Sequence, residues 1–136
     1  MLPRLYREAP VNSIWEGAGN IQCLDVLRAA RKQPESLEAF LAEVALAEGA
    51  DLRLDAALAE LRGELADTDD VELRARRIVE RLATCLQGSL LVRHAPHEVA
   101  DAFCATRLGG EGGRAYGTLP RRVDRAAIVE RHKPRA

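Results

Sequence analysis

Residues 71–94, "VELRARRIVERLATCLQGSLLVRH", contain the longest helical pattern of the chain. Apolar side chains recur there at intervals of three and four residues, the spacing that places them on one face of an α-helix. A helix that is apolar on one side has to bury that side against another element. The stretch therefore predicts a helix inside a packed helical fold. Its apolar positions are Val71, Ala75, Ile78, Val79, Leu82, Leu86 and Leu90.

Shorter patterns of the same kind lie on both sides of this stretch. Pro34 suits the first turn of a helix. We expect Asn20 to cap the helix that begins there, and Asp67–Asp70 to end one helix and cap the next. No segment alternates as a strand does, and the short connections favour antiparallel neighbours. We therefore predict an all-α, antiparallel up-and-down helical bundle, with further helices over residues 20–32, 34–48, 51–66, 96–108 and 122–131.

The composition is that of a globular protein: 136 residues, 47% hydrophobic and 30% charged. This length suffices for one hydrophobic core. The three cysteines have no C-x-x-C spacing, which favours free thiols and predicts no metal site. No apolar run is long enough to cross a bilayer. We expect a cytoplasmic location and no membrane contact.

Charge is unevenly distributed, with a net charge of −9 over residues 34–70 and +5 over residues 114–136. Such a split suggests complementary surfaces in an assembly or a tail that meets an anionic partner; a solvated acidic helix face is the alternative. Arg74, Arg76, Arg77 and Arg81 form a small basic patch that could contact phosphates, and the helical spacing turns Arg76 away from the other three. Pairing with acidic residues of the same helix, Glu72 and Glu80, is the competing interpretation.

Two other motifs carry little functional signal. Residues 110–115 fit the G-x-G-x-x-A pattern of dinucleotide-binding folds, but that pattern requires a preceding strand, and a helix precedes it here. A flexible turn is the better interpretation. His94 and His97 have a spacing that could ligate a metal on a helix, but Pro96 interrupts it. We interpret them as a polar corner between helices.

The stretch "NSIWEGAGN", residues 12–20, places a carboxylate beside the only tryptophan. Apolar surroundings disfavour an ionised carboxyl group and can tune it as a proton acceptor. The glycines that follow allow the backbone to approach a ligand closely before a helix begins. Taken alone, Glu16 could equally be a partner of the helix dipole.

The longer stretch "LPRLYREAPVNSIWEGAGNIQCLDVL", residues 2–27, resembles the C-terminal catalytic segment of the acyl-CoA dehydrogenase superfamily. It is most similar to the branch of AidB-type alkylation-response flavoproteins. The resemblance implies a parent with a helical N-terminal domain, a β-barrel domain and a C-terminal four-helix bundle, assembled as a tetramer with FAD. That parent would oxidise the CH–CH bond of an acyl-CoA thioester.

The resemblance also assigns roles to residues of the motif. Glu16 aligns with the base that removes the α-proton of the thioester. Ala18 and Asn20 fall on positions that contact FAD, and Trp15 and Gly17 would line the substrate pocket. Ala18 departs from the family pattern, in which a Ser or Thr hydroxyl is common at that position.

The resemblance further implies two parts, residues 1–33 as the end of the catalytic helical domain and residues 34–136 as an additional helical bundle. We expect this chain to be inactive without the missing N-terminal and β-barrel domains. In the AidB-type branch the added bundle is associated with duplex DNA, although residues 34–136 carry a net charge of −3. An oligomer-forming module is the further alternative. The DNA contacts would be Arg74, Arg77, Arg81, Arg121, Arg122 and Arg125.

Overall fold

The computed structural model describes residues 2–15, 17–112, 115 and 117–134. In these residues all regular elements are helical and no strand occurs, which confirms the all-α prediction. None of their helices is both long and apolar enough to cross a membrane. The elements in chain order are α1 (Leu2–Glu8), η1 (Ala9–Ser13), α2 (Gly19–Lys32), α3 (Pro34–Ala45), α4 (Leu52–Ala66), η2 (Val71–Arg74), α5 (Ala75–His94), α6 (His97–Phe103), η3 (Cys104–Leu108) and α7 (Arg125–Arg131).

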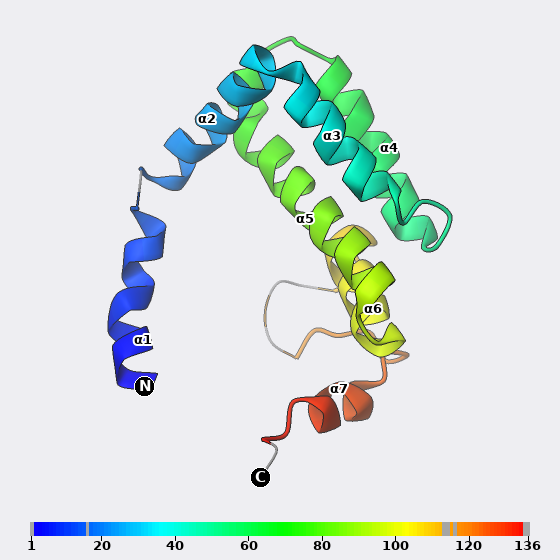
Figure 1. Ribbon diagram of the computed structural model, residues 1–136. Coiled ribbons are helices and arrows are strands. Elements are labelled where there is room, and N and C mark those ends of the chain that lie inside the picture. The colour runs from blue at the N-terminus through cyan, green and yellow to red at the C-terminus, as the bar shows by residue number, and fades with distance from the viewer. Residues whose placement is uncertain (1, 16, 113–114, 116, 135–136) are drawn as a thin grey trace.

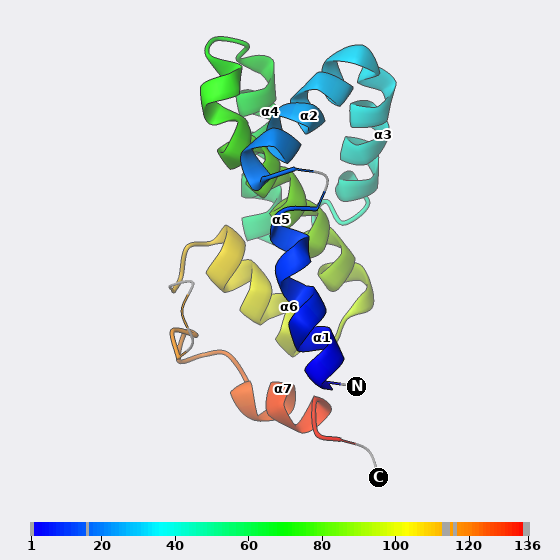
Figure 2. The ribbon, with the colours of Figure 1, turned by 90° about the vertical axis from the view of Figure 1, so that its left-hand side faces the viewer.

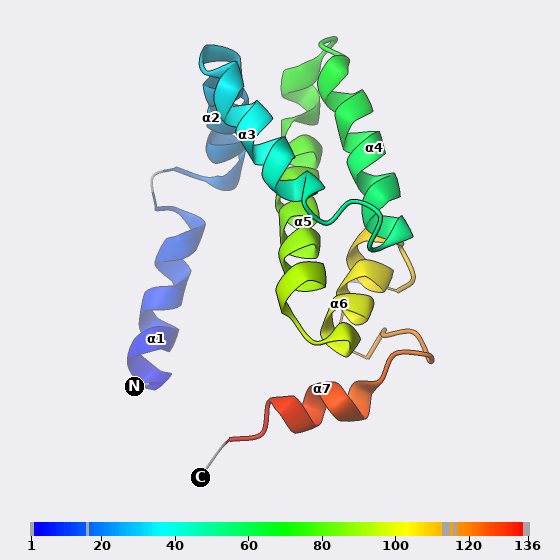
Figure 3. The same cartoon turned by 45° about the vertical axis from the view of Figure 1, so that its right-hand side comes forward.

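Helix α5, the stretch with the longest apolar pattern, is the centre of the bundle. It packs against α2, α3, α4 and α6, and successive helices run up and down beside it (Figure 1). Figure 3 shows α4 alongside α5, with α6 returning from the lower end of α5. The predicted antiparallel arrangement is thus confirmed.

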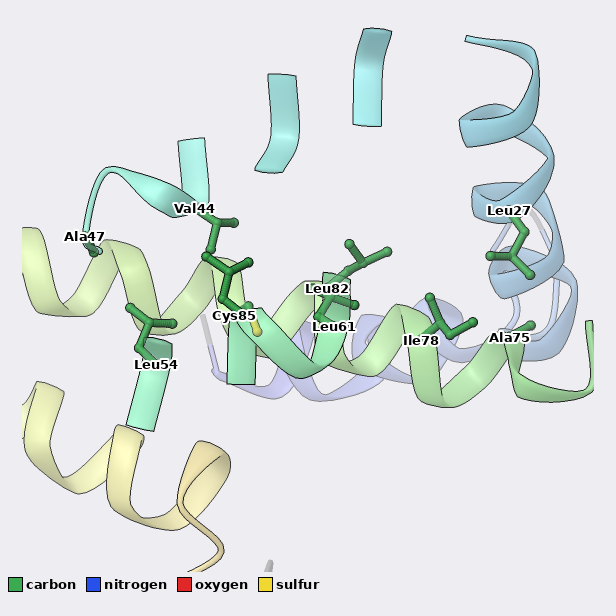
Figure 4. Close-up of a cluster of buried hydrophobic side chains, with 10 residues drawn as sticks. Leu27, Val44, Ala47, Leu54, Leu61, Ala75, Ile78, Leu82 and Cys85 are labelled. Atoms are coloured by element: carbon green, nitrogen blue, oxygen red, sulfur yellow. The ribbon is translucent and has the colours of Figure 1, made fainter. Parts of the chain in front are cut away.

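The hydrophobic core lies between α5 and the helices around it. Leu61 of α4 and Ile78 of α5 have no exposed surface, and Val44 of α3 is equally buried. Burial of such a side chain stabilises the fold by about 1.5–3 kcal/mol. Figure 4 shows Leu27 of α2 facing Ala75 and Ile78 at the first turn of α5. Helix α2 therefore contributes to the same core as the helices that follow it.

Helix starts agree with the sequence in two places and differ in two. Pro34 occupies the first turn of α3, and the Asp51 side chain caps α4 by accepting from the backbone N–H groups of Arg53 and Leu54. Asn20 does not cap α2, because the helix already begins at Gly19 and Ala18 holds the cap position without a side-chain bond. Asp70 precedes η2 in a left-handed conformation (φ 48°) and its side chain makes no capping bond.

The expected helix over residues 96–108 divides into α6 and a π-helical turn, η3. At its end the backbone N–H of Gly109 donates to the carbonyl oxygen of Cys104 at 2.7 Å, a five-residue step that defines the π-helix. The wider turn carries the chain back towards α4, where Gly109 lies against the side chain of Arg53. The predicted final helix is shorter than expected, because α7 begins at Arg125.

The first helical segment stands apart from the bundle. Residues 2–8 and 9–13 form α1 and η1, and none of residues 2–15 is buried (Figures 1 and 2). Large apolar side chains are exposed along this segment and continue onto α2. They are Leu2, Leu5, Tyr6, Val11, Ile14, Trp15, Ile21, Leu24 and Val26. We call this set the apolar arm.

Candidate functional site

Described residues of the segment between η1 and α2 are held by specific backbone features. Gly17 adopts φ 121°, a conformation that side chains other than glycine rarely adopt. A Cβ at Gly17 would also lie 3.2 Å from Cγ2 of Ile21. The Gln22 side-chain amide donates to the carbonyl oxygens of Trp15 at 2.8 Å and Gly17 at 3.2 Å. This amide therefore ties together the backbone on both sides of position 16 in the sequence.

Of the predicted site residues near this turn, three are exposed and Gly17 is partly buried. Trp15 is 64% exposed, and Ala18 and Asn20 are also exposed. Glu16, the predicted base, lies outside the described residues. The Asn20 side chain makes no hydrogen bond within the described chain, so its amide can both donate and accept. The roles of Trp15, Glu16, Gly17, Ala18 and Asn20 stay predictions.

Two residues at this turn were not anticipated from the sequence. Gln22 holds the turn as described. Arg76 of α5, which belongs to residues 34–136, also lies close to it. The Arg76 Nη2 atom is 3.6 Å from the position that a Cβ on Gly19 would occupy. Neither residue belongs to a recognisable sequence motif. Gln22 acts through the conformation of the turn and Arg76 through the packing of two helices, and residue spacing predicts neither.

The arginines proposed as DNA contacts on η2 and α5 are already paired. Arg77 Nε lies 3.1 Å from Glu64, and Arg81 Nη1 lies 2.5 Å from Glu60. Arg74 bonds to the carbonyl oxygens of Asp67 and Asp69 at 2.7 and 2.8 Å, which closes the α4–η2 connection. The hydrogen bond to Glu60 raises the pKa of Arg81 above its ordinary value.

These ion pairs join α4 to η2 and α5, whereas the sequence-based alternative placed them within one helix. We call the set Glu60, Glu64, Asp67, Arg74, Arg77 and Arg81 the interhelix charge ladder. Much of the acidic excess of residues 34–70 is thus matched inside the chain. A guanidinium in this ladder would have to leave its carboxylate before it could bind a phosphate.

The arginines of the C-terminal region differ from one another in their contacts. Arg122 forms a bidentate pair with Glu111 at 2.8 and 3.0 Å. Within the described part of the chain, the Arg125 side chain approaches only the carbonyl oxygen of Pro120, at 3.5 Å. Arg121 is exposed, and no hydrogen bond or ion pair of its side chain is found in the described residues.

A cleft of about 360 Å³ lies beside the interhelix charge ladder, between α4, α5 and η3. Arg77, Arg81 and Arg107 line it together with Glu60 and Glu80, so positive and negative groups nearly balance. Such a lining does not favour a polyanion over water. Among the described residues no group of three potential ligands is placed to hold a metal ion.

The cysteines are free thiols, as the sequence predicts. Cys85 and Cys104 are buried, and burial raises the pKa of both thiols, that of Cys104 to about 11. A thiol that stays protonated at neutral pH is a poor nucleophile. These two cysteines are therefore core residues.

The chain resembles one curated protein over most of its length. It is 39% identical over 112 residues, which is 82% of this chain, to the Escherichia coli (strain K12) protein named "Putative acyl-CoA dehydrogenase AidB". The chain belongs to the AidB-like branch of the acyl-CoA dehydrogenase superfamily. The matched region is 20% of the length of that relative. No protein-family model matches the chain.

The extent of the similarity also bears on the residues beyond 33. A match over 112 residues is too long for residues 1–33 alone, so the likeness to the AidB protein reaches well into residues 34–136. The boundary at residue 33 stays a proposal. Packing crosses it, because Leu27 shares one core with Val44, Leu61 and Ile78.

The cofactor implied by the acyl-CoA dehydrogenase family is FAD. The described residues at the turn fit this group chemically: the exposed amide of Asn20 can hydrogen-bond, and the exposed methyl group of Ala18 offers little steric obstruction. The nearby guanidinium of Arg76 is complementary to phosphate. The Ser or Thr hydroxyl common at position 18 in the family is absent.

Proposed function

We propose that this chain is the part of an FAD-dependent acyl-CoA dehydrogenase-like flavoprotein that carries the catalytic carboxylate. Glu16 would remove the α-proton of an acyl-CoA thioester, and Trp15 and Gly17 would line the pocket around the thioester. Asn20 would hydrogen-bond the flavin cofactor. FAD, when bound, supplies the acceptor for the β-hydride in such oxidations of a CH–CH bond.

The observation that carries this proposal is the defined backbone of Trp15 and Gly17, next to the apolar arm. Gln22 and the positive φ of Gly17 define the backbone of Trp15 and Gly17, the residues on either side of Glu16 in the sequence, and a positioned base requires defined neighbours. Apolar surface is left uncovered around the motif, since Ile14 and Trp15 are 69% and 64% exposed. The chain spans a fifth of the length of its relative, and we propose that the apolar arm packs against domains corresponding to the remainder.

The test is the Glu16→Gln substitution in the full-length flavoprotein that contains this chain. We expect acyl-CoA oxidation, followed with an electron-accepting dye, to fall by at least about 100-fold, because a positioned general base contributes roughly 10²–10⁴ to the rate. Glu72→Gln is the matched control, since it removes an exposed carboxylate of η2 distant in sequence from the motif. We expect its activity to be unchanged.

Two results would contradict the proposal. Turnover of Glu16→Gln equal to that of Glu72→Gln would remove Glu16 from the mechanism. A full-length protein that binds no FAD, judged from its visible absorption spectrum, would remove the flavoprotein assignment altogether. The isolated 136-residue chain is expected to show no turnover, because the other pocket walls are proposed to come from elsewhere.

Assembly is the second candidate function, and the pairing of Arg74, Arg77 and Arg81 in the interhelix charge ladder favours it over DNA binding. A guanidinium that already has a carboxylate partner is less available to a phosphate. Under this proposal residues 34–136 support an oligomer. Analytical ultracentrifugation of the full-length protein with and without residues 34–136 tests it by giving the number of subunits, and the same number of subunits in both forms would exclude it.

A further inference from the structure

Arg76 is held at the predicted cofactor turn by the packing of α5 on α2. It is the second residue of α5, between Ala75, which is 4% exposed, and the first buried turns of that helix. Ile78 and Leu27 pack in the same cluster (Figure 4). A well-packed cluster of this kind fixes the position of α5 relative to α2, and with it the position of the Arg76 backbone.

The guanidinium of Arg76 lies beside the residue between the two predicted FAD contacts. A Cβ built on Gly19 would be 3.6 Å from Nη2 and 4.0 Å from Nη1 and Cζ of Arg76. The planar group therefore lies next to the backbone that joins Ala18 to Asn20. The cation comes from residues 34–136, whereas the turn belongs to residues 1–33.

Arg76 differs from its neighbours in having no partner among the residues that the structure describes. Arg74, Arg77 and Arg81 are paired in the interhelix charge ladder. Arg76 is exposed, and none of the hydrogen bonds or ion pairs found in the described residues involves its side chain. A guanidinium stays charged at any physiological pH and presents a fork of donors that matches phosphate oxygens. A charge fixed at a ligand-binding turn and left unpaired is suited to an anionic ligand group.

We propose that Arg76 binds a phosphate group of the ligand held at this turn, so that the additional helical bundle completes the cofactor site. This inference rests on the proposed function. Both FAD and acyl-CoA carry a pyrophosphate, and the chemistry that Arg76 recognises is common to the two. The arginine acts by binding and takes no part in proton or hydride transfer.

The experiment compares Arg76→Gln with Arg62→Gln in the full-length flavoprotein. Arg62 is an exposed arginine of α4, so the two variants lose the same charge at different places. FAD is removed and then titrated back while flavin fluorescence is followed, and CoA is titrated separately into the FAD-loaded protein. We expect Arg76→Gln to weaken one of these affinities about tenfold and to lower its dependence on KCl concentration, because one ionic contact is lost. Arg76→Lys, which keeps the charge, should recover most of the affinity.

The two titrations distinguish the phosphate sources. A tenfold loss for FAD with unchanged CoA binding assigns the contact to the flavin dinucleotide, and the opposite result assigns it to CoA. If Arg76→Gln and Arg62→Gln bind both ligands as the unsubstituted protein does, the inference is wrong and the proposed function still stands. If the unsubstituted protein binds no FAD, both fail. Thermal unfolding of each variant separates loss of binding from loss of folding.

Discussion

Replacement of Leu27 by alanine tests whether α2 belongs to the same cooperative unit as the helices beyond residue 33. The Leu27 side chain is 8% exposed and lies in the cluster with Ile78. The substitution removes about three methylene equivalents at about 0.8 kcal/mol each. A residual cavity adds to this cost. We therefore expect the free energy of unfolding of the 136-residue chain to fall by about 2–3 kcal/mol.

The assay is urea unfolding followed by far-UV circular dichroism. With a slope of roughly 1–3 kcal/mol per molar urea, the midpoint should fall by about 0.7–3 M with little change in slope. Leu73→Ala is the matched control, because Leu73 is 85% exposed and its loss should change stability by no more than about 0.5 kcal/mol. Equal midpoints for the two variants would refute the shared core. Two separate transitions would show that α2 unfolds independently.

Two further predictions concern titratable groups. The hydrogen bond from the Arg53 side chain holds the pKa of Asp51 below its ordinary 3.8. The ionised Asp51 therefore contributes its full stabilisation of the folded state above pH 3.8, and this contribution is lost as the pH falls through the lower pKa of the folded state. The stability advantage over Asp51→Asn should therefore shrink between about pH 5 and about pH 2 in urea unfolding; an advantage independent of pH would disprove the ionic contribution. Iodoacetamide at neutral pH should label the partly exposed Cys23 well before the buried Cys104, whose pKa is raised to about 11. Mass spectrometry of the native protein checks the order, and equal labelling would show that the core around Cys104 opens readily.

The helices were predictable because their apolar spacing is regular. The α3 and α4 stripes around Val44, Leu58 and Leu61 follow the three- and four-residue intervals and are buried. The π-helical turn was not predictable from periodicity, because it lies against α4, a helix far from it in sequence. Ile21 and Leu24 show the opposite case: their spacing predicts burial, yet they are 52% and 39% exposed, since the pattern does not say which surface covers it.

The candidate site was predictable from the sequence only where a motif carries it. The W-E-G stretch pointed to Glu16, and the positive φ of Gly17 agrees with the expected close backbone approach. Gln22 acts through two carbonyl oxygens whose positions depend on the turn itself. The position of the Arg76 guanidinium depends on how α5 packs against α2. Interactions between residues that are far apart in sequence are set by packing, which a local pattern does not record.

The interhelix charge ladder has a consequence for how this surface could change during evolution. Arg77 and Arg81 are masked electrostatically by Glu64 and Glu60, which stand on a different helix. Exchange of those two glutamates for glutamines would unmask both cations and shift the local charge by two positive units without altering any arginine. In related sequences, a gain of polyanion affinity should therefore be sought in the acidic positions of α4, because the arginine content of α5 alone would not reveal it.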